Sequence, residues 1–221
     1  HINKYQINYM ITKNIRRVLV IAPHTDDGEF GCGGTIAKLI SEGVDIHYVA
    51  FSACEKSVLP EFPSDILLTE VTAATKVLGI KKENLHILNY DVRTFSSNRQ
   101  AILDDLIKLK KQINPELVFI PSLNDVHQDH ATIAIEAVRA FKFINILSYE
   151  LPWNNFKFST TCFFILEEEH LKTKIESLKS YKSQEHRSYA SEEFIKSLAI
   201  TRGTQIGRRF AEVFEVVRFV S

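Results

Sequence analysis

The sequence predicts an α/β protein whose mainly parallel β-sheet is covered by helices on both faces. The main observation is that short apolar runs alternate with longer stretches of helical period along the 221 residues. A second observation is that several runs are apolar throughout, as expected for strands buried on both faces. The length allows one domain with a substantial hydrophobic core.

Three pairs of a strand and a helix are expected in the first half of the chain. The run RRVLVIAP is continuous and apolar, as in a buried strand, and the helical period that follows it ends at Gly43. A later helix begins with a Ser-Asp capping signal and ends at Gly79. The expected strands are 16–23, 45–51 and 85–90, and the expected helices are 33–43, 63–80 and 98–114.

The second half continues the alternation and ends in a strand. An apolar strand is expected at 115–122, followed by helical spacing in the back half of 124–141. Strands at NILSYE and TTCFFIL, helices at about 168–182 and 191–202, and a strand at 211–220 complete the chain. Without a repeat or linker, residues 10–221 are expected to form one domain. Met10 is the only methionine, so residues 1–9 are expected to be an extension.

Composition narrows the classes of partner and compartment. Lys plus Arg and Asp plus Glu both number 27, so the net charge of zero indicates neither nucleic acid nor a charged membrane surface as a partner. No apolar run has the length of a membrane span, and the N-terminus lacks the apolar stretch of a signal peptide. Three scattered cysteines suit a reducing compartment, so a cytoplasmic protein is expected. The oligomeric state is left open, a homo-oligomer included.

Two polar clusters follow apolar strands of the predicted sheet. Residues 24–29 follow the first strand within VLVIAPHTDDGEFGCGG, and residues 124–130 follow the fourth strand within PSLNDVHQDH. In open parallel sheets, ligands bind beyond the carboxyl ends of the strands. The two clusters are therefore expected to lie at the same edge of the sheet and to form one site.

The residue types of these clusters suit a catalytic metal. Two imidazoles and a carboxylate are typical zinc ligands, and a catalytic zinc keeps one position open for water. Zinc lowers the pKa of that water from 15.7 to about 7, and a carboxylate that does not bind the metal can take its proton. The candidate residues are His24, Asp26, Asp27, His127, Asp129 and His130.

Simpler interpretations of the same residues stay open at this point. Asp26 or Asp27 could only cap the following helix, and His127 and His130 could be exposed residues of a loop. The His-x-Asp pattern also occurs in iron oxygenases, but their all-β barrels do not match the alternation of strands and helices here.

The glycine patch GCGG (31–34) raises the alternative of a Rossmann-type nucleotide-binding or redox domain. The dinucleotide fingerprint G-x-G-x-x-G would need a third glycine where this chain has Ile36. The acidic residue expected about 20 residues further on is also missing, because Asp45 comes too early. Glycines that allow a helix to approach the preceding loop closely explain the patch better.

The chain resembles the LmbE-like/PIG-L family of metal-dependent N-deacetylases. The resemblance rests on PHTDDGEFGCGGTIAKLISEG and on PSLNDVHQDH about a hundred residues later. It extends through TEVTAATKVLGI, SLKSYKSQ and GRRFAEVFEVVRF, and so covers most of residues 16–220. It implies a Rossmann-like three-layer fold with C-terminal additions, and hydrolysis of an N-acyl bond.

The resemblance also implies how the metal is held. His24, Asp27 and His130 match the family's metal ligands, with zinc as the expected ion and iron(II) as a possible substitute. The implied substrate is a small N-acetylated amino-sugar conjugate, such as a derivative of N-acetylglucosamine. The residues that would bind the sugar stay unknown.

Three further residues match the family's catalytic positions. Asp26 would be the general base for the zinc-activated water. His127 would stabilise the oxyanion or protonate the leaving amine, and Asp129 would orient His127 by a hydrogen bond.

The chain departs from the family pattern at three positions. Thr25 replaces the usual proline, and Gly28 stands where glutamate is common, with Glu29 next to it. Leu67 occupies a position where relatives often carry an arginine. We expect Thr25 to affect the stiffness of the turn, Glu29 to compensate for Gly28, and Leu67 to change how substrate is bound.

The sequence therefore predicts a zinc-dependent deacetylase of an N-acetylated amino sugar. The alternatives are the nucleotide-binding or redox domain and a hydrolase of a non-sugar amide. Outside the two clusters, the stretch SQEHRSYASEE (183–193) is expected to be a solvated loop that could also border the pocket.

Overall fold

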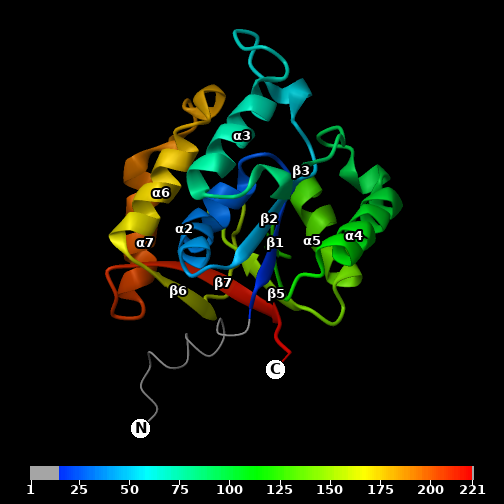
Figure 1. The fold of residues 1–221 in the computed structure, drawn as a ribbon. Coiled ribbons are helices and arrows are strands. Elements are labelled where there is room, and N and C mark those ends of the chain that lie inside the picture. Colours follow the sequence, from blue (N-terminus) through cyan, green and yellow to red (C-terminus); the bar gives the residue numbers. More distant parts are fainter. Residues whose placement is uncertain (1–14, 221) are drawn as a thin grey trace.

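The computed structural model describes residues 15–220 and shows a seven-stranded sheet between two layers of helices (Figure 1). The strand order is β3-β2-β1-β4-β5-β7-β6, with parallel pairing from β3 to β5 and antiparallel pairing of β7 to both neighbours. The predicted α/β class and mainly parallel sheet are confirmed. The strands are β1 (Arg17–Ala22), β2 (Asp45–Ala50), β3 (Leu85–Ile87), β4 (Leu117–Pro121), β5 (Asn145–Tyr149), β6 (Cys162–Leu166) and β7 (Phe210–Arg218).

Helices cover both faces because successive residues of the central strand point to opposite sides. Val18 and Val20 face one core and Leu19 and Ile21 the other. The first core is covered by α2 (Asp27–Ser41), α3 (Ile66–Leu78), α6 (Glu168–Leu178) and α7 (Glu192–Thr204), and the second by α4 (Arg99–Ile113) and α5 (Gln128–Ala140) (Figure 1). The short 3-10 helices are η1 (Glu55–Ser57), η2 (Lys82–Asn84), η3 (Phe95–Ser97), η4 (Lys182–Gln184) and η5 (Ser188–Ala190).

The described helices include none that is long and apolar enough to cross a membrane. The expected extension at 1–9 lies outside the described residues. Most predicted boundaries agree with the structure within a few residues. One helix differs more, since α2 begins at Asp27 and not at residue 33.

The strand order changes direction at β1. The chain runs outward from β1 to β2 and β3, then returns through α4 to β4, which pairs with the other side of β1. Val18 lies opposite Leu117 and Val20 opposite Phe119, so the two strands end side by side. Such a point opens a crevice beyond the carboxyl ends of the strands. The loops that follow β1 and β4 both lead into it.

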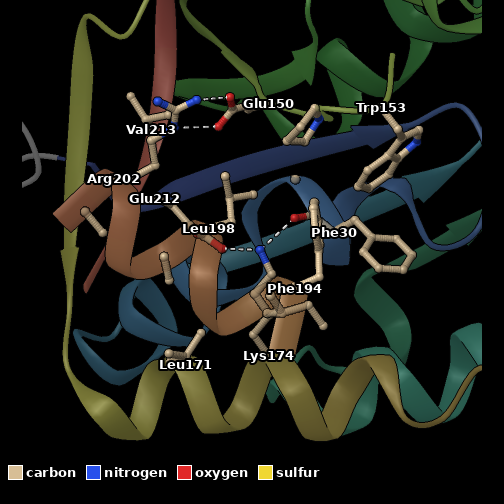
Figure 2. A pocket seen from close by; sticks show the side chains of 15 residues that line it. Phe30, Glu150, Trp153, Leu171, Lys174, Phe194, Leu198, Arg202, Glu212 and Val213 are labelled. Atoms are coloured by element: carbon tan, nitrogen blue, oxygen red, sulfur yellow. Dashed lines mark hydrogen bonds and ion pairs between the residues drawn. The ribbon is translucent and has the colours of Figure 1, made fainter. Parts of the chain in front are cut away.

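Helix α2 contains an irregular turn at Cys32, and an ion pair from other elements replaces the backbone hydrogen bond that is lost there. The helix can therefore extend back to Asp27. Cys32 has non-helical angles of φ −147° and ψ 21°. In an unbroken helix the Gly34 amide would donate to the Phe30 carbonyl. Here the Gly34 amide donates to Glu212 Oε1 over 3.0 Å, while Phe30 accepts a 2.6 Å bond from Lys174 Nζ. Lys174 and Glu212 complete the link with a 2.6 Å ion pair (Figure 2).

The same contact explains the glycine patch. A Cβ on Gly34 would lie 2.5 Å from the Leu166 side chain and 3.2 Å from Glu212 Oε1, so only glycine allows this approach. Glu212 Oε2 also accepts the Thr35 amide over 2.6 Å. The amides of Gly34 and Thr35 are thus bonded to a carboxylate and do not offer a site for a nucleotide phosphate.

A second buried network holds the turn between β1 and α2. Tyr48 and Tyr181 both bring their hydroxyls to the Thr25 carbonyl, at 2.9 and 2.8 Å, and to the Glu29 carboxyl. A Cβ on Gly28 would lie 2.5 Å from the Tyr48 ring, so the absent side chain makes room for that tyrosine. In this chain the turn is thus supported by Glu29 and the two tyrosines, with Gly28 leaving space for the Tyr48 ring.

The ion pair in α2 leads to a prediction about stability. We expect Glu212→Ala to lower the free energy of unfolding by about 3–5 kcal/mol, because buried Lys174 would lose its partner. Denaturant unfolding measures this. Glu168→Ala is the control, since the exposed pair of Glu168 with Arg209 should contribute less than about 1 kcal/mol. Equal losses in the two variants would contradict a special role for Glu212.

The Glu29 network leads to a prediction about pH. Burial raises the pKa of Glu29 from 4.5 to about 8, despite the tyrosine hydrogen bonds, so the folded chain keeps a proton that the unfolded chain loses. Stability from this group therefore falls as pH rises between those values, by at most about 1.4 kcal/mol per pH unit. We expect Glu29→Gln to flatten the decline when unfolding is measured from pH 5 to 8. Glu169→Gln, at an exposed position of α6, is the control. An unchanged decline would contradict the prediction.

Candidate active site

Three ligand-type atoms from the two predicted clusters converge beyond β1 and β4. His24 Nδ1 and Asp27 Oδ2 are 3.2 Å apart, and His130 Nε2 lies 3.2 Å from each of them. His24 follows β1, Asp27 begins α2, and His130 lies in the first turn of α5. Segments about a hundred residues apart in sequence thus form one triangle of two nitrogens and one oxygen.

The outer nitrogen of each imidazole is held by a carboxylate. His130 Nδ1 lies 2.8 Å from Asp125 Oδ2, and His24 Nε2 lies 3.2 Å from Asp129 Oδ2. When these outer nitrogens donate, the inner nitrogens point their lone pairs into the triangle. This arrangement of carboxylate, histidine and shared centre is typical of protein metal sites.

The charges of the cluster depend on its burial. Burial lowers the pKa of His130, but Asp27 and Asp125 outweigh this effect and raise the pKa to about 10. Burial also lowers the pKa of His24, while its hydrogen bonds to Asp129 and Asp27 raise it above the ordinary value. Burial raises the pKa of Asp27, but the two histidines hold it well below its usual range. In the chain by itself, a protonated His130 offsets part of the carboxylate charge, and a bound cation would displace its inner proton.

Asp26 lies at the start of α2 and lines the cavity beside the triangle. Its side chain makes no capping hydrogen bond, so the interpretation of this residue as a mere helix cap is wrong. Burial and the charge of Asp27 raise the pKa of Asp26 to about 6, against the charges of His24 and Arg187. A carboxylate with a pKa near neutrality is suited to accept a proton.

His127 is the N-cap of α5, and its Nδ1 accepts the Asp129 amide over 3.2 Å. Because Nδ1 is the acceptor, the proton of the neutral ring resides on Nε2. Burial and the nearby histidines His130 and His24 lower the pKa of His127, which favours that neutral form. His127 therefore presents an N–H donor to the cavity that it lines.

The expected partner of the Asp129 carboxylate needs a correction. Its Oδ2 contacts His24 and accepts the Arg93 amide over 2.7 Å, whereas only its backbone N–H reaches His127. The reason is the helix start, because capping by His127 turns its Nδ1 toward the backbone of α5. Asp129 thus orients a residue of the triangle.

The site opens into a cavity of about 250 Å³. Besides the site residues, its walls come from the loop after β3, the loop after β5 and the segment around η4 and η5. Leu67 of α3 lines it, at the position noted above as a departure from the family pattern. The other lining residues include Cys54, Val92, Arg93, Trp153, Asn154, Gln184, Arg187 and Tyr189.

Sequence reasoning missed Asp125 and the contribution of the Arg93 amide. The pattern NDVHQDH contained a signal for Asp125, an additional carboxylate five residues before His130. No sequence signal marks Arg93, whose φ of 68° is uncommon for a residue with a side chain. All six predicted site residues lie together beyond the ends of β1 and β4.

Curated relatives with similar sequences are named as deacetylases. The chain is 29% identical over 174 residues to the uncharacterized deacetylase YaiS of Escherichia coli K12, covering 75% of this chain and 90% of the relative. It is 23% identical over 230 residues to the diacetylchitobiose deacetylase of Thermococcus kodakarensis, covering 94% and 84%.

A solved structure shows the same fold. The N,N'-diacetylchitobiose deacetylase of Pyrococcus horikoshii superposes with a TM-score of 0.78 at 22% identity, covering 98% of this chain and 94% of that one. The family model described as PIG-L, GlcNAc-PI de-N-acetylase, matches residues 19–141, which include both site loops. The chain belongs to the PIG-L family.

Proposed function

We propose that this protein is a zinc-dependent deacetylase that removes the acetyl group from the nitrogen of an N-acetylated amino-sugar conjugate. The observation that carries the proposal is the triangle of His24 Nδ1, Asp27 Oδ2 and His130 Nε2, with 3.2 Å on every side. Ligands at about 2.0–2.1 Å from a tetrahedral zinc are themselves about 3.3 Å apart. The donor set, two nitrogens and one carboxylate oxygen, is also that of a catalytic zinc site.

The surroundings of the triangle support this metal assignment. Asp125 and Asp129 orient the two imidazoles from behind, so the ligand atoms are arranged before an ion binds. His24, His127 and His130 also have nitrogens within 4.8 Å of one another, but Asp27 forms the tighter set with His24 and His130. When bound, zinc would polarise the amide carbonyl and lower the pKa of water. Iron(II) would suit the same donors.

Asp26 would move the protons, and His127 would stabilise the oxyanion. Asp26 lies next to ligand Asp27 in sequence, yet lines the cavity without capping α2, so it can accept a proton from the attacking water. The Nε2–H of His127 would donate a hydrogen bond to the oxygen that gains negative charge at the acyl carbon. The proton that Asp26 has accepted from the water would then pass to the nitrogen of the leaving amine as the C–N bond breaks.

The sugar class is supported by the relatives. The relatives from Thermococcus kodakarensis and Pyrococcus horikoshii are named for diacetylchitobiose, a substrate with N-acetyl groups on sugar rings. Trp153 and Tyr189 stack at 3.9 Å between ring centroids and both line the cavity, which provides an apolar wall for a sugar ring.

The metal assignment is tested by zinc affinity. We expect the chain to bind about one equivalent of zinc, His130→Ala to abolish tight binding, and Asp125→Asn to weaken it by about 10- to 100-fold. Competition with a fluorescent chelator and elemental analysis measure both effects. His186→Ala removes an exposed histidine outside the cavity lining and serves as the control. Tight zinc binding by His130→Ala would refute the ligand set.

The catalytic assignment is tested by acetate release. We expect Asp26→Asn to keep zinc affinity but to lower the rate by at least about 100-fold, because the carboxylate that accepts the proton is lost. Methyl N-acetylglucosaminide and diacetylchitobiose serve as sugar substrates, and an N-acetylated peptide tests the alternative of a non-sugar amide. Full activity of Asp26→Asn would remove this residue from the mechanism. Release of acetate from the peptide alone would refute the sugar class.

A further inference from the structure

One cation on the cavity wall is held by neutral groups only. Arg187 lines the cavity between η4 and η5, and its Nε donates to Gln184 Oε1 over 2.6 Å. Its Nη1 donates to the Tyr189 hydroxyl over 2.8 Å. Among residues 15–220, no carboxylate lies within ion-pair distance of this guanidinium. Three of its five N–H groups are thus left for a ligand or water.

A chain of buried hydrogen bonds from Glu70 through Ser183 and Gln184 orients the guanidinium of Arg187. Gln184 is only 7% exposed, and its Nε2 donates to Ser183 Oγ over 3.0 Å. Ser183 in turn gives its hydroxyl and its amide to the buried carboxylate of Glu70, at 2.6 and 2.9 Å. These bonds fix the amide of Gln184 so that its oxygen faces Arg187. The guanidinium of Arg187 is therefore held in one orientation, although Arg187 is exposed to solvent.

The aromatic cluster of Phe30, Trp153 and Tyr189 also restrains the guanidinium of Arg187. Tyr189 stacks on Trp153 with only 8° between the ring planes and meets Phe30 edge to face at 5.4 Å. Arg187 also lies over the Tyr189 ring, 5.8 Å from its centroid. Stacking and two hydrogen bonds reduce the side-chain freedom that binding would otherwise remove.

Arg187 lies where it can contact a part of the ligand outside the triangle. It lines the same cavity as Asp26, and its charge acts on that carboxylate without an ion pair between them. A ligand whose acetamide lies at the triangle therefore shares one cavity with the guanidinium. Arg93 adds a second cation to the lining.

We propose that Arg187 is a specificity residue that binds an oxyanion, carboxylate or phosphate, on the aglycone of the sugar substrate. The inference rests on the proposed function and narrows its substrate class to anionic conjugates. A planar guanidinium offers paired N–H donors that match either anion, and a charged pair in a partly enclosed site forms strong hydrogen bonds. A neutral sugar hydroxyl would form only the weaker hydrogen bonds of an uncharged acceptor with this group.

Binding of amine products tests the inference without any need for turnover. The probes for the zinc-loaded chain are methyl glucosaminide, carboxymethyl glucosaminide and glucosamine 1-phosphate, compared by calorimetry. We expect the unmodified chain to bind at least one anionic probe about 10-fold or more tightly than the methyl glycoside. Arg187→Gln should remove most of that preference and leave the affinity for the methyl glycoside within about 2-fold. The anionic probe that loses affinity identifies the carboxylate or the phosphate.

Lys182→Gln is the matched control. It removes one positive charge from the same segment, but Lys182 pairs with Glu185 and lies outside the cavity lining. The anion preference should persist in this variant. Equal affinity of all three probes for the unmodified chain, no binding of the anionic ones, or an equal loss for all three in Arg187→Gln would overturn the inference.

The proposed function is tested separately by acetate release from methyl N-acetylglucosaminide. Failure of this reaction would count against the deacetylase assignment, while the calorimetric preference would still decide the role of Arg187. Hydrolysis of the methyl glycoside without any anion preference would overturn only the inference about Arg187.

Discussion

The site depends on balancing the charge of carboxylates that the fold removes from water. Asp27, Asp125 and Asp129 are 6%, 5% and 0% exposed, and an unpaired buried carboxylate would cost several kcal/mol. Each is therefore bonded to an imidazole of His24 or His130, and each imidazole lies between two carboxylates. This alternation ties the loop after β1 to the loop after β4. It also leaves one nitrogen of each ring directed at a common centre.

A second buried ion pair, between Lys174 and Glu212, supports helix α2, which carries Asp27 at its start. The pair of Lys174 and Glu212 bridges the break in α2, which lets the first turn of that helix carry Asp27 into the crevice while the rest packs along the sheet. Through this ion pair, helix α6 and strand β7 contact the helix that carries Asp27. The C-terminal additions to the sheet are thus part of the support of the site and not an appendage.

Two adjacent aspartates can have different functions because they occupy an irregular turn. Asp26 is the residue before α2, with φ −102° and ψ −9°, whereas Asp27 is the first helical residue. Their side chains consequently face different surroundings, and their pKa values move apart, to about 6 for Asp26 and well below the usual range for Asp27. Such a divergence between neighbouring titratable groups supports the proposed roles of Asp26 as base and Asp27 as metal ligand.

The sequence by itself determined the alternation of strands and helices, the common edge of the two polar clusters and their six residues, because strand burial and parallel pairing leave a direct record in the pattern of apolar runs. It did not determine which carboxylate meets which imidazole. Asp129 contacts His24 and Asp125 contacts His130, since the helix start at His127 fixes those directions in space. The early start of α2 and the place of Arg187 in the cavity wall were also decided by the tertiary structure alone. Both depend on partners far away in the chain, Glu212 for α2 and the relay through Glu70 for Arg187, and local periodicity contains no information about such distant contacts.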